Sequence, residues 1–198
     1  TTFSEGNCKM TSTTGEGGIS HEVGTFGLTA GKWYWEVKMT TMTTSGGNIR
    51  IGITDAIAIA DPERLGNQVN DAYSNGQYGN YSANGNIYHN NGNDSYGGAW
   101  NQANSGQGKI IGVALDLDNN KIYFAIDNTW QASGDPAADS NGHAITAATS
   151  TSGGQYFPTM VDQDDSVQVQ EANFGGCPSF TLSSAAADGN GYGAFEYA

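Results

Sequence analysis

The chain has 198 residues, including 29 glycines, and a formal net charge of −13 from 20 acidic and 7 basic side chains. An acidic surface repels phosphate backbones, and the sequence holds no Lys/Arg cluster to offset it, so nucleic-acid binding is not expected. Membrane insertion is not expected either, because no apolar run approaches the roughly 20 residues that span a bilayer.

The length fits one domain with a sizeable core, and we expect a single domain over residues 1–198. The chain starts at Thr1 rather than Met and stops abruptly at Ala198, so we expect it to be part of a longer polypeptide. Its two cysteines, Cys8 and Cys177, are too few for a disulfide framework or a zinc site. Two free thiols are favoured over one bridge between the ends of the chain, and both alternatives stay open.

Apolar and polar residues alternate with a period of two in several segments, which predicts strands with one buried face. In the first of these segments, Trp33, Trp35 and other apolar residues share the face that we expect to be buried. In the last, Val167 and Val169 share it. The segments are 32–39, 49–53, 111–117, 122–126 and 167–170.

A hairpin is predicted where Asn119-Asn120 separates two of these strands, because Asn tolerates the positive φ of a two-residue turn. Hairpins build antiparallel sheets, and no long helical segment offers the crossovers that a parallel sheet needs. Between residues 60 and 108 the chain is rich in Asn, Gly, Ser and Tyr, with weaker strand signals at 77–81 and 86–89. Long loops of this kind are often functional.

Five segments, taken in order, resemble the SPRY domain family. The resemblance runs from about Ile19 to Gly176 and is closest to SPRY-containing proteins of bacteriophages. Those proteins share the Trp-Tyr-Trp-Glu start, the Asn/Gly/Tyr-rich middle and the run Gly-Asp-Pro found here at 134–136. The resemblance implies an all-β fold, a bent sandwich of two antiparallel sheets related to the concanavalin-like jelly roll. The segments are 31–37, 49–53, 112–118 with 121–124, 156–158 and 172–175.

The same resemblance implies a non-catalytic module that recognises its partner through loops at one end of the sandwich. For a phage relative it implies a virion-associated, extracellular location. The implied partner is a host-surface protein or glycan, or another virion subunit, and the chain is a candidate homo-oligomer within a virion. One alternative is a purely structural capsid-decoration, tail or fibre domain, and another is a glycan-active enzyme of the jelly-roll type.

Enzyme chemistry finds little support in the sequence. A glycosidase needs two facing carboxylates, whereas Asp116 and Asp118 flank a predicted turn and fit roles in that turn better. The three histidines, His21, His89 and His143, lie in different regions without a nearby acid, so neither a hydrolytic triad nor a zinc site is expected.

Aromatic residues interleaved with Asn, Ser and Gly form the candidate binding site, which we call the aromatic rim. This composition resembles antibody paratopes, in which rigid aromatics supply contact area and small polar residues supply hydrogen bonds. The alternative is that these side chains cover one end of the sandwich or pack in its core. The rim residues are Tyr73, Tyr78, Tyr81, Tyr96 and Trp100, with Trp130 as a weaker candidate.

Calcium is the one cofactor that the sequence leaves open. Asp162, Asp164 and Asp165 place hard oxygen ligands close together in one acidic loop, as Ca²⁺ prefers. The spacing of an EF-hand, with its closing Glu, is absent, so a solvated turn is favoured over a metal site.

Overall fold

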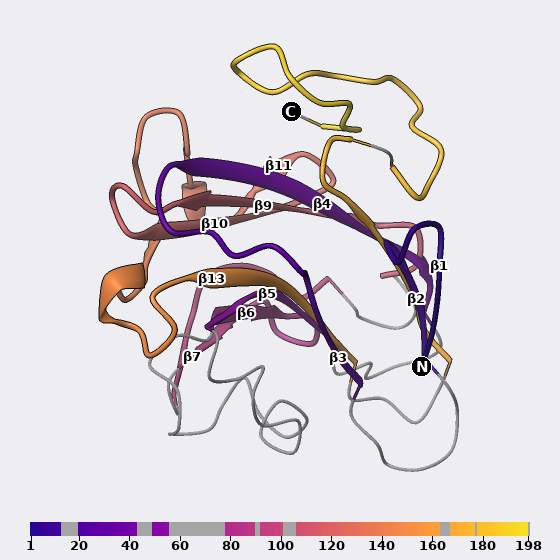
Figure 1. Ribbon diagram of the computed structural model, residues 1–198, viewed down its shortest axis with the longest axis horizontal. Helices are drawn as coiled ribbons and strands as arrows, with labels where there is room; N and C mark the ends of the chain where they lie inside the picture. Colours follow the sequence, from indigo (N-terminus) through magenta and orange to yellow (C-terminus); the bar gives the residue numbers. More distant parts are fainter. Residues whose placement is uncertain are drawn as a thin grey trace.

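The protein folds as two antiparallel β-sheets that face each other (Figure 1). The computed structural model describes residues 1–12, 20–42, 49–55, 78–89, 92–100, 106–162, 167–176 and 178–197. Strand order is β1-β2-β14-β4-β9-β10-β11 in the larger sheet, with β12 also beside β10, and β3-β13-β5-β6-β7-β8 in the smaller sheet. The predicted all-β antiparallel sandwich is confirmed.

The larger sheet consists of β1 (Thr2–Ser4), β2 (Lys9–Thr11), β4 (Lys32–Thr41), β9 (Ile110–Asp116), β10 (Lys121–Ile126), β11 (Thr129–Trp130), β12 (His143–Ala144) and β14 (Val169–Asn173). The smaller sheet consists of β3 (Ser20–Val23), β5 (Ile49–Asp55), β6 (Tyr78–Tyr81), β7 (Ile87–His89), β8 (Gly92–Asp94) and β13 (Tyr156–Asp162). In the described part of the chain, the 3-10 helices η1 (Gln131–Ser133) and η2 (Ala148–Ser150) lie in connections. Within the described ranges, no helical segment has the length and apolar content of a membrane span.

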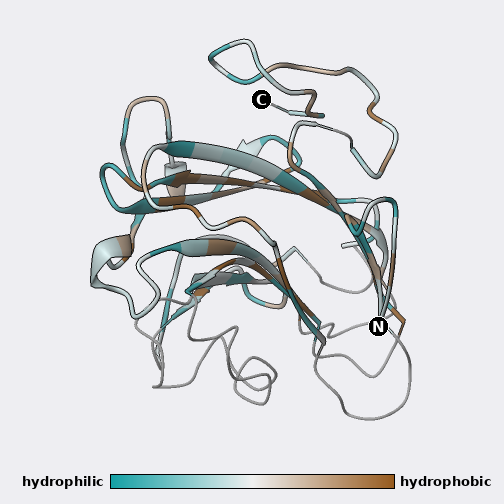
Figure 2. Ribbon diagram, viewed as in Figure 1, coloured by the Kyte–Doolittle hydropathy of each residue, from teal (hydrophilic) through white to brown (hydrophobic). Residues whose placement is uncertain are grey.

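The core lies between the sheets, where inward-facing apolar side chains meet in rows across neighbouring strands. Trp35 pairs with Val113 on β9, and Val113 pairs with Phe124 on β10, so all three are buried on one face. Ile51 and Ile53 of β5 are buried in the opposite sheet, and Figure 2 shows hydrophobic colour on the strands of both sheets. Each fully buried side chain of this size contributes about 1.5–3 kcal/mol relative to an exposed one.

The last predicted strand has the opposite orientation to the one expected. The valines at 167 and 169 are half-buried, whereas Gln168 and Gln170 are buried, so the prediction that the valines face the core is wrong. The cause is the register of β14. Gln170 lies opposite Met10 on β2 and Met39 on β4, and directly opposed residues share a face. Both methionines point into the core.

Residues 178–197, which we call the C-terminal strap, cross the outer face of the larger sheet (yellow in Figure 1). Phe195 is buried in the strap and packs edge-on against Tyr34 of β4, with ring centroids 5.0 Å apart. It also lies against the backbone of Gly175, where an added Cβ would come within 2.6 Å of the Phe195 ring. Gly175 has φ +84°, so it meets both a steric and a conformational requirement for glycine.

The strap covers a carboxylate that would otherwise face solvent. Glu36 points away from the core on β4 and is nevertheless 0% exposed. Its two oxygens accept hydrogen bonds from the backbone N–H groups of Glu196 (2.9 Å) and Tyr197 (2.6 Å), the Tyr34 hydroxyl (3.1 Å) and the Asn173 amide (3.2 Å). Burial raises the pKa of Glu36, and these four donors act in the opposite direction. The carboxylate therefore anchors the end of the strap, and Asn173 adds a hydrogen bond to the carbonyl of Ala194.

Glu36→Gln is expected to lower the free energy of unfolding by about 2–4 kcal/mol and to loosen the strap. The amide –NH₂ of Gln would face two of the four donors, and each buried donor left without an acceptor costs about 1–3 kcal/mol. Urea denaturation measures the stability, and limited proteolysis measures the accessibility of residues 178–197. Glu5→Gln, at an exposed carboxylate, is the matched control and should change neither quantity. Equal stability of Glu36→Gln and the native chain would contradict the anchoring role.

Candidate functional site

An apolar groove opens between β3 and β13 of the smaller sheet and β4 and β14 of the larger one. Its volume is about 350 Å³, within the range of ligand pockets. Phe26 and Phe174 lie at its mouth, 39% and 36% exposed, and their rings meet edge to face with centroids 4.9 Å apart. The lining comes from Phe3, residues 6–8, residues 22–26, Trp35, Val37, residues 158–160, Ala172 and Phe174.

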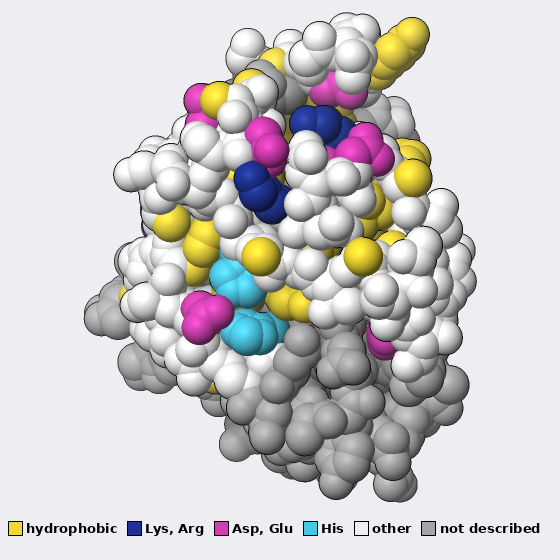
Figure 3. Space-filling view, turned by 90° about the vertical axis from the view of Figure 1, so that its left-hand side faces the viewer, with side chains coloured by type: hydrophobic (Ala, Val, Ile, Leu, Met, Phe, Trp, Pro, Cys, Tyr) yellow, Lys and Arg dark blue, Asp and Glu magenta, His cyan; other side chains and the backbone are white. Residues whose placement is uncertain are grey.

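A second and wider hollow lies at the opposite edge of the smaller sheet, where β7 and β8 approach β12. Its volume is about 710 Å³. The face of the molecule seen in Figure 3 carries two adjacent histidine side chains with an acidic side chain beside them. These belong to the lining of the hollow, which comprises Tyr78, His89, Asp94, Tyr96, Ala132 and residues 141–146.

The strand register explains why these polar side chains converge, since directly opposed residues share a face. His89 on β7 lies opposite Tyr78 on β6, and Asp94 on β8 lies opposite Ile87 on β7. All four therefore share the face that is turned toward the larger sheet. On that sheet, His143 of β12 lies opposite the buried Ile122 of β10 and faces inward as well.

The two histidines meet the aspartate at the same oxygen atom. Asp94 Oδ2 lies 2.9 Å from His89 Nε2 and 3.0 Å from His143 Nε2. The hydrogen bond from His143 lowers the pKa of Asp94, which keeps the carboxylate charged at neutral pH. Burial lowers the pKa of His143, opposed by its contact with Asp94, so the imidazole is neutral at pH 7.

The expectation that the histidines lie apart and without an acid is therefore wrong for His89 and His143. His89 and Asp94 stand on either side of a hairpin connection, a spacing that could have been recognised from the sequence if β7 and β8 had been paired correctly. His143 is 49 residues beyond Asp94 and belongs to the other sheet, so no local signal points to it. His21 lies on β3 and contacts the Thr159 hydroxyl instead.

The SPRY domain family model matches residues 32–176, which include every strand of the two sheets except β1, β2 and β3. The chain belongs to the SPRY domain family. No curated protein sequence matches it. Among solved structures, the SPRY domain of human HERC1 is similar with a TM-score of 0.59 and 14% identity, over 87% of this chain and 89% of that one. SPRY domains are generally non-catalytic protein-interaction modules.

Three members of the predicted aromatic rim are core residues of this SPRY domain. Tyr78, Tyr96 and Trp100 are 3%, 7% and 1% exposed, so the expectation of an exposed rim is wrong for them. Buried Tyr and Trp need partners for their polar ends. Trp100 Nε1 donates to Asn80 Oδ1 at 2.8 Å, and the Tyr78 hydroxyl is 3.0 Å from the Thr146 hydroxyl. Tyr78 and Tyr96 also line the histidine-bearing hollow.

The other rim candidates have different outcomes. Trp130 on β11 is half-buried and meets the rings of Tyr34 and Tyr123 edge-on, at centroid distances of 6.4 Å in each case. Tyr73 and the side chain of Tyr81 lie outside the described residues. A ligand-binding role of these three aromatics stays a prediction.

Most of the proposed calcium loop also lies outside the described residues, which omit Asp164 and Asp165. Asp162 is the last residue of β13 and is buried opposite Ile49 of β5. It therefore belongs to the end of a paired strand, and calcium binding by the three aspartates stays a prediction. The prediction that Cys8 and Cys177 are free thiols also stays a prediction, because Cys177 is not among the described residues.

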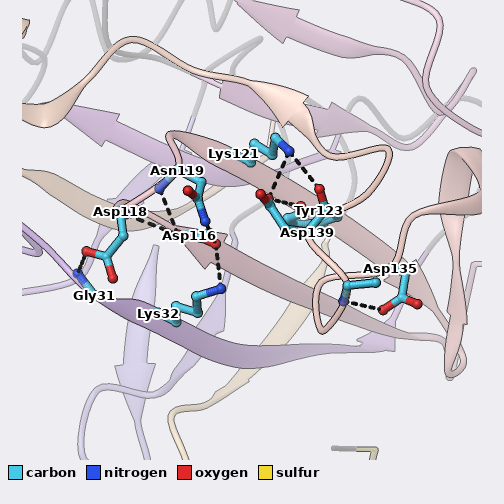
Figure 4. A network of polar contacts seen from close by, with 10 residues as sticks. Gly31, Lys32, Asp116, Asp118, Asn119, Lys121, Tyr123, Asp135 and Asp139 are labelled. Carbon is cyan, nitrogen blue, oxygen red and sulfur yellow. Dashed lines mark hydrogen bonds and ion pairs between the residues drawn. The ribbon is translucent and has the colours of Figure 1, made fainter.

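The carboxylates of the central hairpin serve the turn, as predicted. Asp116 Oδ1 accepts hydrogen bonds from the N–H groups of Asp118 and Asn119, and Asp118 accepts one from Gly31 N–H (Figure 4). Burial alone would raise the pKa of Asp116, but the Lys32 ammonium, 2.8 Å away, and the Asn119 bonds lower it below its usual value. The carboxylates of Asp116 and Asp118 thus both have hydrogen-bond partners within the hairpin and its neighbour β4 or the residue before it.

The turn itself is longer than the predicted two residues. Lys121 pairs with Asp116, which leaves residues 117–120 as a four-residue connection. Asn120 adopts φ +55°, so the positive φ expected for an Asn in this turn is confirmed at one of the two predicted positions. The capping of two N–H groups by Asp116 stabilises the longer form.

Trp100→Ala is expected to lower the free energy of unfolding by about 3–5 kcal/mol, because it empties a buried indole site and leaves Asn80 Oδ1 without the indole donor. Trp33→Ala, at a tryptophan that is 46% exposed, is the control and should cost about 1 kcal/mol or less. Chemical denaturation followed by circular dichroism measures both. Equal stability of Trp100→Ala and Trp33→Ala would restore a surface role for Trp100.

Proposed function

We propose that this SPRY domain is a non-catalytic recognition module of a bacteriophage virion protein, which binds a protein on the host surface. The apolar groove carries the proposal. Contiguous exposed apolar surface on a soluble domain is unusual and marks binding sites. Here Phe3, Phe26 and Phe174 are exposed together around a groove whose lining is mainly apolar.

The groove favours a protein partner over a glycan. An aromatic or aliphatic side chain of a partner fits an apolar pocket of about 350 Å³ and can serve as a buried anchor residue. The net charge of −13 favours partners with basic residues around that anchor, since complementary charge speeds and selects association. A glycan, by contrast, requires several hydrogen-bonding groups close to a stacking ring, and polar side chains are the minority of the lining, at Asn7, Glu22, Thr25 and Thr159.

The virion location rests on the resemblance of the sequence to phage SPRY proteins. The run Trp33-Tyr34-Trp35-Glu36 and the run Gly134-Asp135-Pro136 carry that resemblance. Within a virion the groove could instead be filled by another virion subunit or a second copy of this chain, as in a structural decoration or fibre domain. Antibodies against the domain should label purified virions of the source phage, and labelling of infected-cell lysate alone would contradict the location.

Phe26→Ala is expected to weaken binding of peptides selected from a displayed random library by about tenfold or more, equivalent to about 1.4 kcal/mol. The mutation removes half of the edge-to-face pair at the mouth of the groove. Tyr192→Ala is the matched control, because Tyr192 is a highly exposed aromatic of the C-terminal strap, outside the groove. Fluorescence polarisation with the selected peptides measures the affinities, and thermal unfolding checks that both variants are folded.

Three outcomes would contradict the proposed partner class. Equal affinities of Phe26→Ala and the native chain would place peptide binding on another surface. Binding on a glycan array without any selected peptide would favour a glycan. Concentration-dependent self-association that Phe26→Ala abolishes, measured by light scattering, would make a second copy the occupant and favour the structural alternative.

A further inference from the structure

His89, Asp94 and His143 form a compact group of three potential metal ligands. One ligand atom from each residue lies within 4.8 Å of the other two, and both histidines turn Nε2 toward Asp94 Oδ2. The three side chains project into the same hollow, at the edge of the core, and Figure 3 shows an acidic side chain beside two histidines on this face.

The distances suit a small transition-metal ion. Zinc binds imidazole nitrogen at about 2.0–2.1 Å and carboxylate oxygen at about 2.0–2.2 Å in tetrahedral geometry, which places two ligand atoms about 3.3–3.4 Å apart. The separations of Asp94 Oδ2 from the two Nε2 atoms are 2.9 and 3.0 Å. A few tenths of an ångström of outward movement would admit the ion, and the exposed side chain of Asp94 has room for that movement.

The rings are held in place before any ion binds. The His89 ring stacks on Tyr78 with centroids 5.8 Å apart and planes at 15°, and the His143 ring contacts Tyr78 and Tyr96 at 5.9 and 6.2 Å. Tyr78 is fixed in turn, because its hydroxyl accepts a hydrogen bond from Thr146 N–H at 2.8 Å. Ligands whose rotamers are already restricted lose less entropy on binding.

We propose that His89, Asp94 and His143 bind a divalent transition-metal ion of the zinc class. Two imidazoles and one carboxylate are a borderline-soft donor set, which suits Zn²⁺ better than Ca²⁺ or Mg²⁺ with their preference for oxygen ligands. Three protein ligands leave a fourth position that faces the hollow. His89 and Asp94 come from the smaller sheet and His143 from a strand paired to the larger one, so the ion would link the two sheets.

The test uses the chain after treatment with EDTA and desalting. Zinc chloride is titrated by calorimetry, and thermal unfolding is followed with and without the metal. The native chain is expected to bind one Zn²⁺ and, at about 100 times Kd, to gain roughly 5–10 °C in Tm. Calcium and magnesium chloride should produce neither effect at the same concentrations.

The variants His89→Ala, His143→Ala and Asp94→Asn are each expected to raise the Kd for zinc tenfold or more and to remove the rise in Tm. His21→Ala is the matched control, since His21 lies on β3 and contacts Thr159 rather than the hollow. Asp94→Asn is the variant least expected to disturb folding, because the Asp94 side chain is largely exposed and its amide replacement is nearly isosteric. Loss of zinc binding in this variant therefore reports on the ligand and not on the fold.

Two results would overturn the site. The first is a native chain that binds no zinc. The second is zinc binding that His89→Ala and Asp94→Asn leave unchanged, or that His21→Ala weakens as much as they do. Neither result bears on peptide binding in the apolar groove, which lies at the other edge of the smaller sheet and is tested through Phe26.

Discussion

The apolar contact between the two sheets is the constraint on which the other features of the molecule depend. The inward side chains of β4, β9 and β10 pack against those of β5 and β13. This packing excludes water only where both sheets are present. Strand β3 and strand β8 are the two edges of the smaller sheet. The apolar groove lies at the first edge and the histidine-bearing hollow at the second. Both are places where inward-facing positions are no longer fully covered.

This arrangement explains why His89, Asp94 and His143 come from strands, each at a position that faces inward near the edge of the core. Along the inward face, Ile53 is followed across the smaller sheet by Tyr78 and then His89. The side chains in this row change from aliphatic to amphipathic to polar toward the edge at which the larger sheet no longer covers the smaller one. In the described part of the middle region, Asn80 accepts a hydrogen bond from the buried Trp100 indole. At this position an amide side chain serves the polar end of a core aromatic ring.

The sequence predicted what depends on local alternation. Local alternation predicted the strands around 111–117 and 122–126, the antiparallel sandwich and the turn role of Asp116. Each of these features is set by a few neighbouring residues. Strand alternation could not decide which face of 167–170 is buried, since that depends on Met10 and Met39, more than a hundred residues away. For the same reason the convergence of His89 with His143 across two sheets had no signature in the chain.

The hydrogen bonds of the Glu36 carboxylate make the C-terminal strap part of the folding unit. The family match stops at residue 176, and a fragment cut there would lack the strap and with it the two backbone donors of Glu196 and Tyr197. It would also uncover Tyr34 where Phe195 now lies. Boundaries drawn from sequence similarity would thus divide a hydrogen-bonded unit. Expression and crystallisation of this domain should keep residues 177–197, so that Glu36 retains its two backbone donors.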